Sequence, residues 1–217
     1  MKISHYSDGE MLAQAVAREV VLAAETAVAE RGLFHLVLAG GSTPRRCYEL
    51  MRNIDVPWLK MHIWFGDERC LPVGDAERND TMADAALLKH VPLPLDNIHR
   101  IPAEMGPEAG ADKYSELLCH APAMDLVLLG MGEDGHTASL FPGNPALKDG
   151  RPAVPVFGSP KPPPERISMG LAYLNSARRR LVMVVGESKR EAWRNLQVEK
   201  NLPVAMLFEP EWYSTLS

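Results

Sequence analysis

The sequence predicts an α/β protein in which a mostly parallel sheet is flanked by helices. Apolar runs of four or five residues recur along the chain, and segments with the apolar spacing of a helix lie between them. Most of these runs lead into a glycine or a glycine pair. Strands without polar alternation are typical of strands buried on both faces, and their alternation with helices favours parallel pairing.

The first predicted unit is a helix, a strand, a glycine turn and a second helix. Apolar residues recur on one face over residues 9–31, which indicates a helix, and the run 34–38 indicates a buried strand. After the glycine turn, Ser42 or Thr43 can cap a new helix with Pro44 at its first position.

The same alternation continues to the end of the chain. We expect strands at 62–65, 125–129, 181–185 and 204–208, and helices at about 81–89, at 108–120 and from about 187. The proline-rich segment 152–164 is expected to be a semi-rigid surface loop. The arginine run 178–180 precedes a strand and is expected to be solvated.

Composition narrows the function class. The chain has 217 residues, of which 46% are hydrophobic and 24% charged, with a formal net charge of −5. This balance excludes a disordered chain, and the absence of a long basic tract disfavours nucleic acid as a partner. No apolar run approaches the roughly 20 residues that cross a bilayer, and the first residues lack a signal-peptide pattern. We expect one domain over residues 1–217, in the cytoplasm, without a membrane or obligate protein partner.

Cysteine and metal chemistry have little support in the sequence. Cys47, Cys70 and Cys119 are far apart and form no C-x-x-C pair, so neither a disulfide framework nor a zinc site is expected. Neither H-E-x-x-H nor G-x-S-x-G occurs, and no cysteine neighbours a plausible base. Covalent acyl transfer and metal catalysis are therefore not predicted.

Four predicted strands lead into clusters of glycine and polar residues. The clusters are 40–43 (GGST), 66–69 (GDER), 130–136 (GMGEDGH) and 186–189 (GESK). Ligands of open α/β sheets bind beyond the carboxyl ends of the strands, so the four clusters predict one binding site. Arg69 and Lys189, in two of these clusters, are candidate contacts for a phosphate or a carboxylate.

The first cluster suits an anion. Gly40, Gly41, Ser42 and Thr43 place backbone N–H groups and two hydroxyls at a helix N-terminus, with Arg45 or Arg46 as further charge. The cluster is not a Walker loop, and a plain capped turn is the alternative interpretation.

The third cluster matches G-x-G-x-x-G, but we reject a dinucleotide site. Glu133 and Asp134 would face the pyrophosphate, and too few residues precede Pro142 for the crossover helix. Instead, Asp134 stands two residues before His136, where a carboxylate can orient an imidazole as a general base. The alternative is a solvated loop histidine, which is the expectation for most of the other six.

Several blocks together resemble one family. LAGGSTP at 38–44, FGDERCLP at 65–72 with Asn79, LLGMGEDGHTASLFPG at 128–143, SPKPPPERIS at 159–168 and VVGESKREA at 184–192 are similar to the 6-phosphogluconolactonase family. Glucosamine-6-phosphate deaminases share the fold and have similar GGSTP and DGH blocks. The deaminases carry a tyrosine where this chain has Arg69 and a glutamate where it has Phe141, which favours the lactonase.

The resemblance implies a Rossmann-like, NagB-type α/β sheet and hydrolysis of 6-phospho-D-glucono-1,5-lactone to 6-phosphogluconate, without a cofactor. It implies that His136 is the general base, that Asp134 orients it, and that Asp67 contacts sugar hydroxyls or positions water. Substrate binding falls to Arg69 and Lys189 as phosphate contacts, and to Gly40, Gly41, Ser42 and Thr43 as lining.

Some choices stay open at this point. The oxyanion could be stabilised by backbone N–H groups near Gly40 and Gly41 or by Arg69. A sugar-phosphate isomerase or deaminase of the same fold, and a non-catalytic sugar-phosphate sensor, are the alternative functions.

Overall fold

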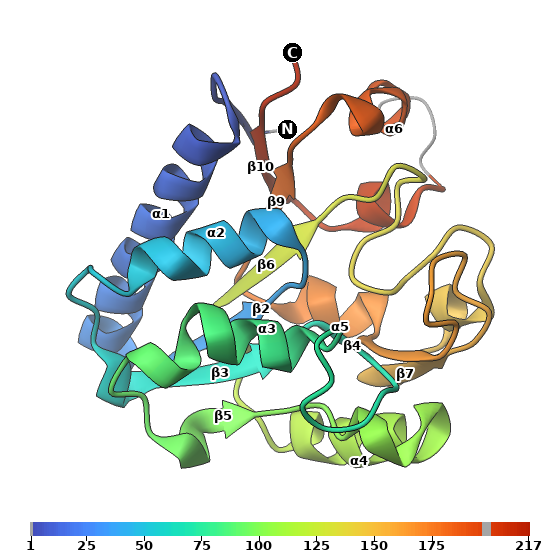
Figure 1. The fold of residues 1–217 in the computed structure, drawn as a ribbon, viewed down its shortest axis with the longest axis horizontal. Coiled ribbons are helices and arrows are strands. Elements are labelled where there is room, and N and C mark those ends of the chain that lie inside the picture. The colour runs from blue at the N-terminus through green and yellow to red at the C-terminus, as the bar shows by residue number, and fades with distance from the viewer. Residues whose placement is uncertain (1, 197–200) are drawn as a thin grey trace.

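The computed structural model describes residues 2–196 and 201–217, and its centre is a seven-stranded parallel sheet (Figure 1). The order of the strands in this sheet is β1-β10-β9-β6-β2-β3-β5. Its strands are β1 (Lys2–His5), β2 (Phe34–Leu38), β3 (Met61–Phe65), β5 (Ile98–His99), β6 (Leu126–Gly130), β9 (Arg179–Val184) and β10 (Glu211–Ser214). The predicted α/β fold with a mostly parallel sheet is confirmed.

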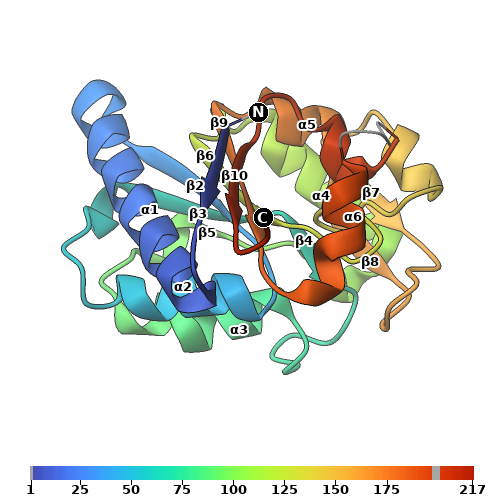
Figure 2. The ribbon, with the colours of Figure 1, turned by 90° about the horizontal axis from the view of Figure 1, so that it is seen from above.

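Helices cover both faces of the sheet. The helices α1 (Gly9–Arg31), α2 (Ser42–Met51) and α3 (Asn79–Ala86) lie on one side, and α4 (Pro107–Cys119), α5 (Leu171–Ser176) and α6 (Arg190–Asn195) lie on the other (Figure 2). The strands between them are almost entirely buried, as the apolar runs predicted.

The long first helix illustrates how local signals set its ends. Asp8 caps α1 by accepting a hydrogen bond from Met11 N at 2.8 Å, and Gly32 ends it in the left-handed conformation with φ of 83°. Leu12, Val16 and other residues of one face are fully buried against the sheet and its neighbours.

The strand order places a crevice beside β2. From β2 the chain passes through α2 to β3 on one side, whereas β6 pairs with the opposite edge of β2. The chain connections that follow β2 and β6 therefore run in opposite directions along the sheet, and the loops after these two strands diverge at the carboxyl ends of the strands. This switch point is where open α/β sheets bind ligands.

A second, antiparallel sheet stands beside the first. Its order is β4-β8-β7, from β4 (Asp67–Arg69), β8 (Arg166–Met169) and β7 (Ala153–Val156). Gly66 alone separates β3 from β4, and its carbonyl accepts a hydrogen bond from Met169 N at 2.7 Å. The residues after β3 therefore belong to the small sheet and form its inner wall.

The small sheet corrects the expectation for the proline-rich segment. Part of 152–164 is β7, and Pro155 lies within that strand. Because β7 is an edge strand, a residue without an N–H can occupy it. The remaining segment, 157–165, is a loop.

The predicted last strand is wrong. Pro203–Met206 forms a 3₁₀ turn, and the final strand is β10, inserted between β1 and β9. Pro203 begins the turn because its fixed φ suits a helical start, and the apolar residues there are buried as a turn.

The arginine run is also not solvated throughout. Arg179 and Arg180 open β9, and Arg180 is only 5% exposed. The guanidinium of Arg179 pairs with Glu211 and Glu19, at 2.7 and 2.6 Å. Carboxylates on β10 and α1 thus hold the guanidinium of Arg179 in a partly buried position.

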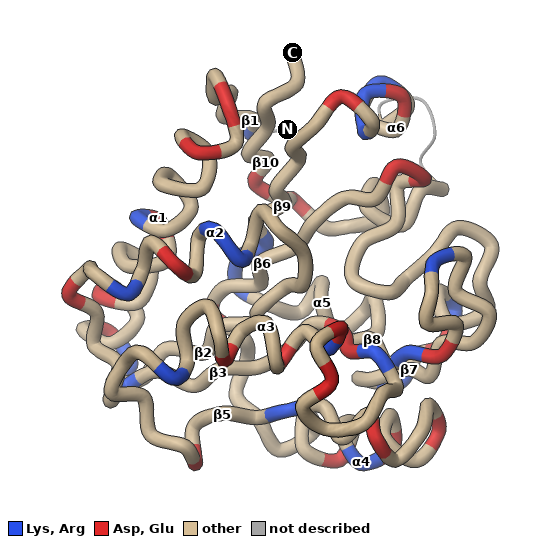
Figure 3. Tube along the Cα trace, viewed as in Figure 1, with Lys and Arg blue, Asp and Glu red and all other residues tan. Residues whose placement is uncertain are grey.

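Two further observations concern the surface and the glycine-rich loop. Among the described residues, no helix is both long and apolar enough to span a membrane. In the same part of the chain, Lys and Arg alternate with Asp and Glu over the trace (Figure 3). Residues 131–141 form turns and an isolated bridge and no helix, so the crossover helix of a dinucleotide fingerprint does not directly follow β6.

Candidate functional site

A cavity of about 360 Å³ lies at the carboxyl ends of β2, β3, β6 and β9. All four glycine clusters contribute to its lining, as the sequence predicted. Of the predicted site residues, the lining includes Gly40, Gly41, Ser42, Thr43, Asp67, Arg69, His136 and Lys189. Asp134 is not part of the lining and lies behind His136, to which it is hydrogen-bonded.

The N-terminus of α2 opens into this cavity. The structure corrects the predicted cap: Gly41 is the N-cap residue with φ of 105°, and Ser42 and Thr43 are the first two helical residues. No side chain caps this end, and the first N–H groups of a helix have no acceptor within it. The backbone N–H groups of Ser42 and Thr43, with the positive end of the helix dipole, are therefore available to an anion.

The two arginines of this helix are engaged elsewhere. Arg45 pairs with Glu49 at 3.1 Å, and Arg46 donates to Glu10 at 2.8 and 2.9 Å and contacts Glu49. Neither is among the lining residues, so the suggestion that they add charge to the anion site is wrong.

His136 and Asp134 form a close pair on the loop after β6. Nδ1 of His136 lies 2.5 Å from Oδ1 of Asp134, which also accepts the backbone N–H of His136 at 3.2 Å. Burial, the largest single influence, raises the pKa of Asp134, but the hydrogen bond from the His136 side chain, the charge of His136 and backbone N–H donors together outweigh it, so the net pKa is lowered. An ionised carboxylate only accepts, so Nδ1 carries the proton and Nε2 is left as the basic nitrogen.

Phe141 packs against the imidazole. The two rings lie 4.6 Å apart between centroids, and Phe141 is only 2% exposed. Position 141 is therefore a buried apolar ring beside His136.

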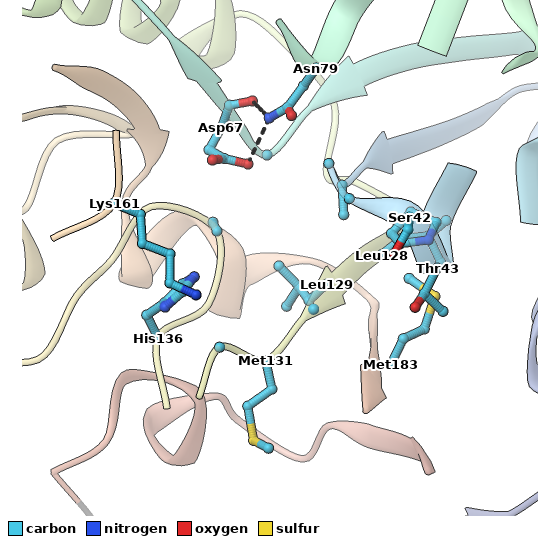
Figure 4. Close-up of a pocket in the computed structure, with 18 of the residues that line it drawn as sticks. Ser42, Thr43, Asp67, Asn79, Leu128, Leu129, Met131, His136, Lys161 and Met183 are labelled. Atoms are coloured by element: carbon cyan, nitrogen blue, oxygen red, sulfur yellow. Dashed lines mark hydrogen bonds between the residues drawn. The ribbon is translucent and has the colours of Figure 1, made fainter. Parts of the chain in front are cut away.

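Asp67 is held on both oxygens. Ser139 Oγ donates to Oδ2 at 2.6 Å, and the amide of Asn79 donates to Oδ1 at 3.2 Å and to the Asp67 carbonyl at 2.9 Å (Figure 4). The residue is 7% exposed. A fixed, ionisable acceptor on the cavity wall suits a sugar hydroxyl or a water.

Cations line the cavity from both sheets. Arg69 comes from β4, and its Nη1 donates to the carbonyl of Glu77. Lys189 follows β9, and burial lowers its pKa. These two cations are where the sequence placed them.

Two further cations were missed by the sequence argument. Arg166, on β8, is 6% exposed and donates to the carbonyls of Lys161, Pro162 and Pro163 at 2.9 to 3.2 Å. It thereby holds the proline-rich loop so that Lys161 lines the cavity, across from Ser42 and Thr43 (Figure 4). The sequence signal that could have identified Arg166 is an arginine at the first position of an apolar strand.

Three histidines expected to be solvated form a buried or half-buried cluster instead. Nδ1 of His62 lies 3.0 Å from Nε2 of His99, and Trp64 Nε1 donates to Nδ1 of His35 at 3.1 Å. His35 is 5% exposed. None of the three lines the cavity. His35 on β2 is in register with His62 on β3, and His99 on β5 is in register with Trp64, two residues further along β3.

The described residues contain no group of three or more His, Cys, Asp or Glu side chains that could hold a metal ion. All three cysteines are free thiols.

Comparison with known proteins places this arrangement in a family. The family model described as glucosamine-6-phosphate isomerases/6-phosphogluconolactonase matches residues 7–215. The chain belongs to this family. The matched range includes the small sheet and every strand of the large sheet except β1, and therefore every residue that lines the cavity.

Several members of the glucosamine-6-phosphate isomerase/6-phosphogluconolactonase family are similar over most of the chain. The chain is 37% identical to a 6-phosphogluconolactonase of Streptomyces coelicolor, over 86% of this chain and 79% of the relative. It is 40% identical to the GDH/6PGL endoplasmic bifunctional protein of Oryctolagus cuniculus over 81% of this chain. That alignment spans only 24% of the bifunctional protein, so this chain corresponds to about a quarter of it.

Solved structures of the family agree with the fold. A 6-phosphogluconolactonase from Thermotoga maritima superimposes with a TM-score of 0.89 at 25% identity, covering 98% of this chain and 97% of that one. A monomeric glucosamine-6-phosphate deaminase superimposes with a TM-score of 0.86 over 99% of this chain and 97% of that one, at 21% identity, a likeness that shows the fold alone.

Proposed function

We propose that this chain hydrolyses 6-phospho-D-glucono-1,5-lactone to 6-phospho-D-gluconate, the second step of the oxidative pentose phosphate pathway. The observation that carries the proposal is the shared cavity: His136, which is hydrogen-bonded to Asp134 behind it, and an uncapped helix N-terminus face the same space. A base and an anion site at fixed separation match a substrate with a reactive carbonyl at one end and a phosphate at the other.

The chemistry needs no nucleophilic side chain. Nε2 of His136 takes a proton from a water molecule as its oxygen attacks the lactone carbonyl carbon. The tetrahedral intermediate then collapses, the bond between this carbon and the ring oxygen breaks, and the imidazolium returns its proton to that oxygen. Asp134 stabilises the imidazolium and holds the ring, and the product is a carboxylic acid that ionises in water.

The phosphate supplies binding energy that positions the carbonyl. We assign it to the N–H groups of Ser42 and Thr43 and to the cations Arg69 and Lys189, with the Gly40 and Gly41 backbone as lining. Interactions with this remote group fix the reacting end near His136 and lower the entropic cost of the attack. Asp67, held by Ser139 and Asn79, is placed to accept a sugar hydroxyl or the attacking water.

Phe141 favours lactone hydrolysis over deamination. The deaminase pattern requires a carboxylate five residues after the histidine, and here a buried aromatic ring occupies that position. Ring opening of an amino sugar would lack this proton carrier, whereas a lactone carbonyl is electrophilic without it. The intact Asp134–His136 pair in turn favours an enzyme over a sugar-phosphate sensor.

The direct experiment is turnover of freshly generated 6-phosphogluconolactone, coupled to 6-phosphogluconate dehydrogenase and corrected for spontaneous hydrolysis. Acceleration by wild-type protein that is lost in His136→Ala supports the proposal. Folded wild-type protein that gives no acceleration overturns it, and release of ammonia from glucosamine-6-phosphate would then point to the deaminase.

A cytoplasmic location and a single lactonase domain over residues 1–217 stay predictions. Three free thiols are compatible with a reducing compartment. Fractionation of the source cells would test the location.

A further inference from the structure

Asn79, the first residue of α3, joins three parts of the cavity wall and enters the reaction proposed above only as a support of Asp67. Its side-chain Nδ2 donates to the carbonyl and to Oδ1 of Asp67, at 2.9 and 3.2 Å. The residue is 6% exposed and itself lines the cavity (Figure 4). Its amide is therefore the link between α3 and the carboxylate of Asp67.

The oxygen of the same Asn79 amide packs against the glycine turn after β2. A Cβ on Gly40 would lie 2.0 Å from Oδ1 of Asn79 and 2.6 Å from its Cγ. The amide thus occupies the space that any other residue at position 40 would fill. Gly40 directly precedes Gly41, the N-cap of α2, so Asn79 also supports the start of the anion site.

A buried carboxylate fixes the backbone of Asn79. Glu68, which is 1% exposed, accepts the backbone N–H groups of Arg69, Asn79 and Asp80, each at 2.8 Å. Glu68, a residue of β4, therefore caps the N-terminus of α3. One side chain holds both Asn79 and the backbone of the cavity cation Arg69.

The basis of this support is an ion cluster beneath the cavity. Arg78, 1% exposed, pairs with Asp80 at 2.9 Å and with Glu104 at 3.0 Å, and its Nε lies 3.9 Å from Glu68. Charges this deeply buried require partners, and these partners make the start of α3 rigid.

We propose that Asn79 is a positioning residue for the lactonase reaction: it holds Asp67 and the Gly40–Gly41 turn in one fixed arrangement. The inference rests on the proposed function, because it concerns the geometry of that site. Asn79 acts through donation of its amide N–H to the Asp67 carboxylate and through contact of its oxygen with Gly40.

The variant Asn79→Asp tests the donor. It keeps the shape of the side chain but sets a second carboxylate against Asp67, and two such groups hold one proton between them more tightly than either does alone. When this proton is bound, the pair again has a donor; when it is lost, the carboxylates repel. The ratio of kcat/KM in the variant to that in wild type should rise about tenfold between about pH 8 and about pH 5.

The ratio removes pH effects that are common to the two proteins, and circular dichroism at each pH gives the folded fraction. Asn97→Asp is the matched control, because the Asn97 amide donates to the Met61 carbonyl at 2.9 Å and is absent from the cavity lining. Its ratio should be independent of pH. A ratio for Asn79→Asp that is also flat, in folded protein, means a merely structural role and overturns the inference.

A second measurement tests the inference even if Asn79→Asp does not fold. Gly40→Ala drives a methyl group into the Asn79 amide, and in wild-type background it should lower kcat/KM by at least about tenfold. In the background of Asn79→Ala, where that space is empty, Gly40→Ala should add little further loss. Additive losses would show that the two residues are not coupled and overturn the inference.

The two proposals fail in different ways. Wild-type protein without lactonase activity removes the proposed function, and the inference with it. If wild-type protein is active, a pH-independent kcat/KM ratio for Asn79→Asp overturns the inference alone. Additive losses of kcat/KM for Gly40→Ala and Asn79→Ala do the same.

Discussion

A Cβ atom on Gly132 would lie 2.0 Å from Nδ1 of His136 and 2.6 Å from Oδ1 of Asp134. The imidazole and its carboxylate partner therefore pack directly over a bare Cα. Gly132 N also donates to the carbonyl of His136 at 2.9 Å, which closes the loop around the ring. The orientation of the His136 imidazole depends on a residue that has no side chain.

Gly132→Ala should displace the imidazole without unfolding the protein, because the added methyl meets side-chain atoms. We expect kcat to fall at least about tenfold, since a displaced base loses its alignment with the attacking water. Gly150→Ala is the matched control, because a Cβ there meets no atom within 4 Å. Lactone turnover and a thermal melt of both variants check this; unchanged kcat in Gly132→Ala would contradict the packing argument.

His136→Ala should lower kcat by about 10²- to 10⁴-fold, the usual contribution of a general base. The fold should persist because the loop is held by backbone hydrogen bonds of Gly132 and Gly135. His5→Ala, at an exposed histidine on β1, should keep wild-type turnover. Full activity in folded His136→Ala would exclude this residue as the base.

Lys189→Ala should raise KM by about 10- to 100-fold with a smaller effect on kcat, because a charged contact to the phosphate is made equally in the ground and transition states. Lys113→Ala removes an exposed lysine on α4 and should change neither constant. Steady-state kinetics of the two variants give the answer. A loss confined to kcat would place Lys189 at the reacting carbonyl instead.

The histidine cluster should make the fold sensitive to mild acid. Burial, followed by the charge of His62, lowers the pKa of His35 to about 4 and that of His99 to about 4, below the model-peptide value near 6.5. The unfolded chain therefore binds more protons between these values. The contribution to stability is complete above about pH 6.5 and is lost as the pH falls toward about 4.

Urea denaturation at about pH 7.5 and about pH 5 measures this effect, with His99→Phe as the informative variant. Phenylalanine can keep the stack on Trp64, whose ring lies 3.9 Å from that of His99, but it does not titrate. Its loss of stability on acidification should be smaller than that of wild type. Glu68, whose pKa burial raises to about 7, acts in the opposite direction but is common to both proteins and cancels in the comparison. Equal losses of stability in wild type and His99→Phe would exclude the histidine cluster as the cause of the acid sensitivity.

The sequence was sufficient for the centre of the fold and most of the cavity. The buried runs of β2, β3, β6 and β9 and their glycine ends are local signals, and parallel strands bring such ends to one edge. Apart from Asp134, which lies behind His136, the predicted residues from Gly40 to Lys189 line one cavity for this reason. Their roles stay predictions until the variants are measured.

The errors arise where non-local pairing decides the structure. β10 has the mixed sequence EWYS and is a strand because it lies between β1 and β9, whereas the more apolar segment before it is a turn. Arg166 was marked in the sequence only by its place at the head of a strand, and Asn79 only by its place in a block that resembles the family. Their importance comes from contacts with residues 161–163 and with Asp67 and Gly40, which are distant or on other elements.

The cavity draws its walls from two sheets, and this divides the recognition of a substrate between them. The α2 terminus, His136 and Lys189 extend from the large parallel sheet, whereas Asp67, Arg69 and Arg166 belong to the small antiparallel one. The small sheet can therefore accept substitutions that change which sugar is bound while the α2 terminus, Lys189 and His136 stay in place. A family that includes both an isomerase and a lactonase is what such a divided framework permits.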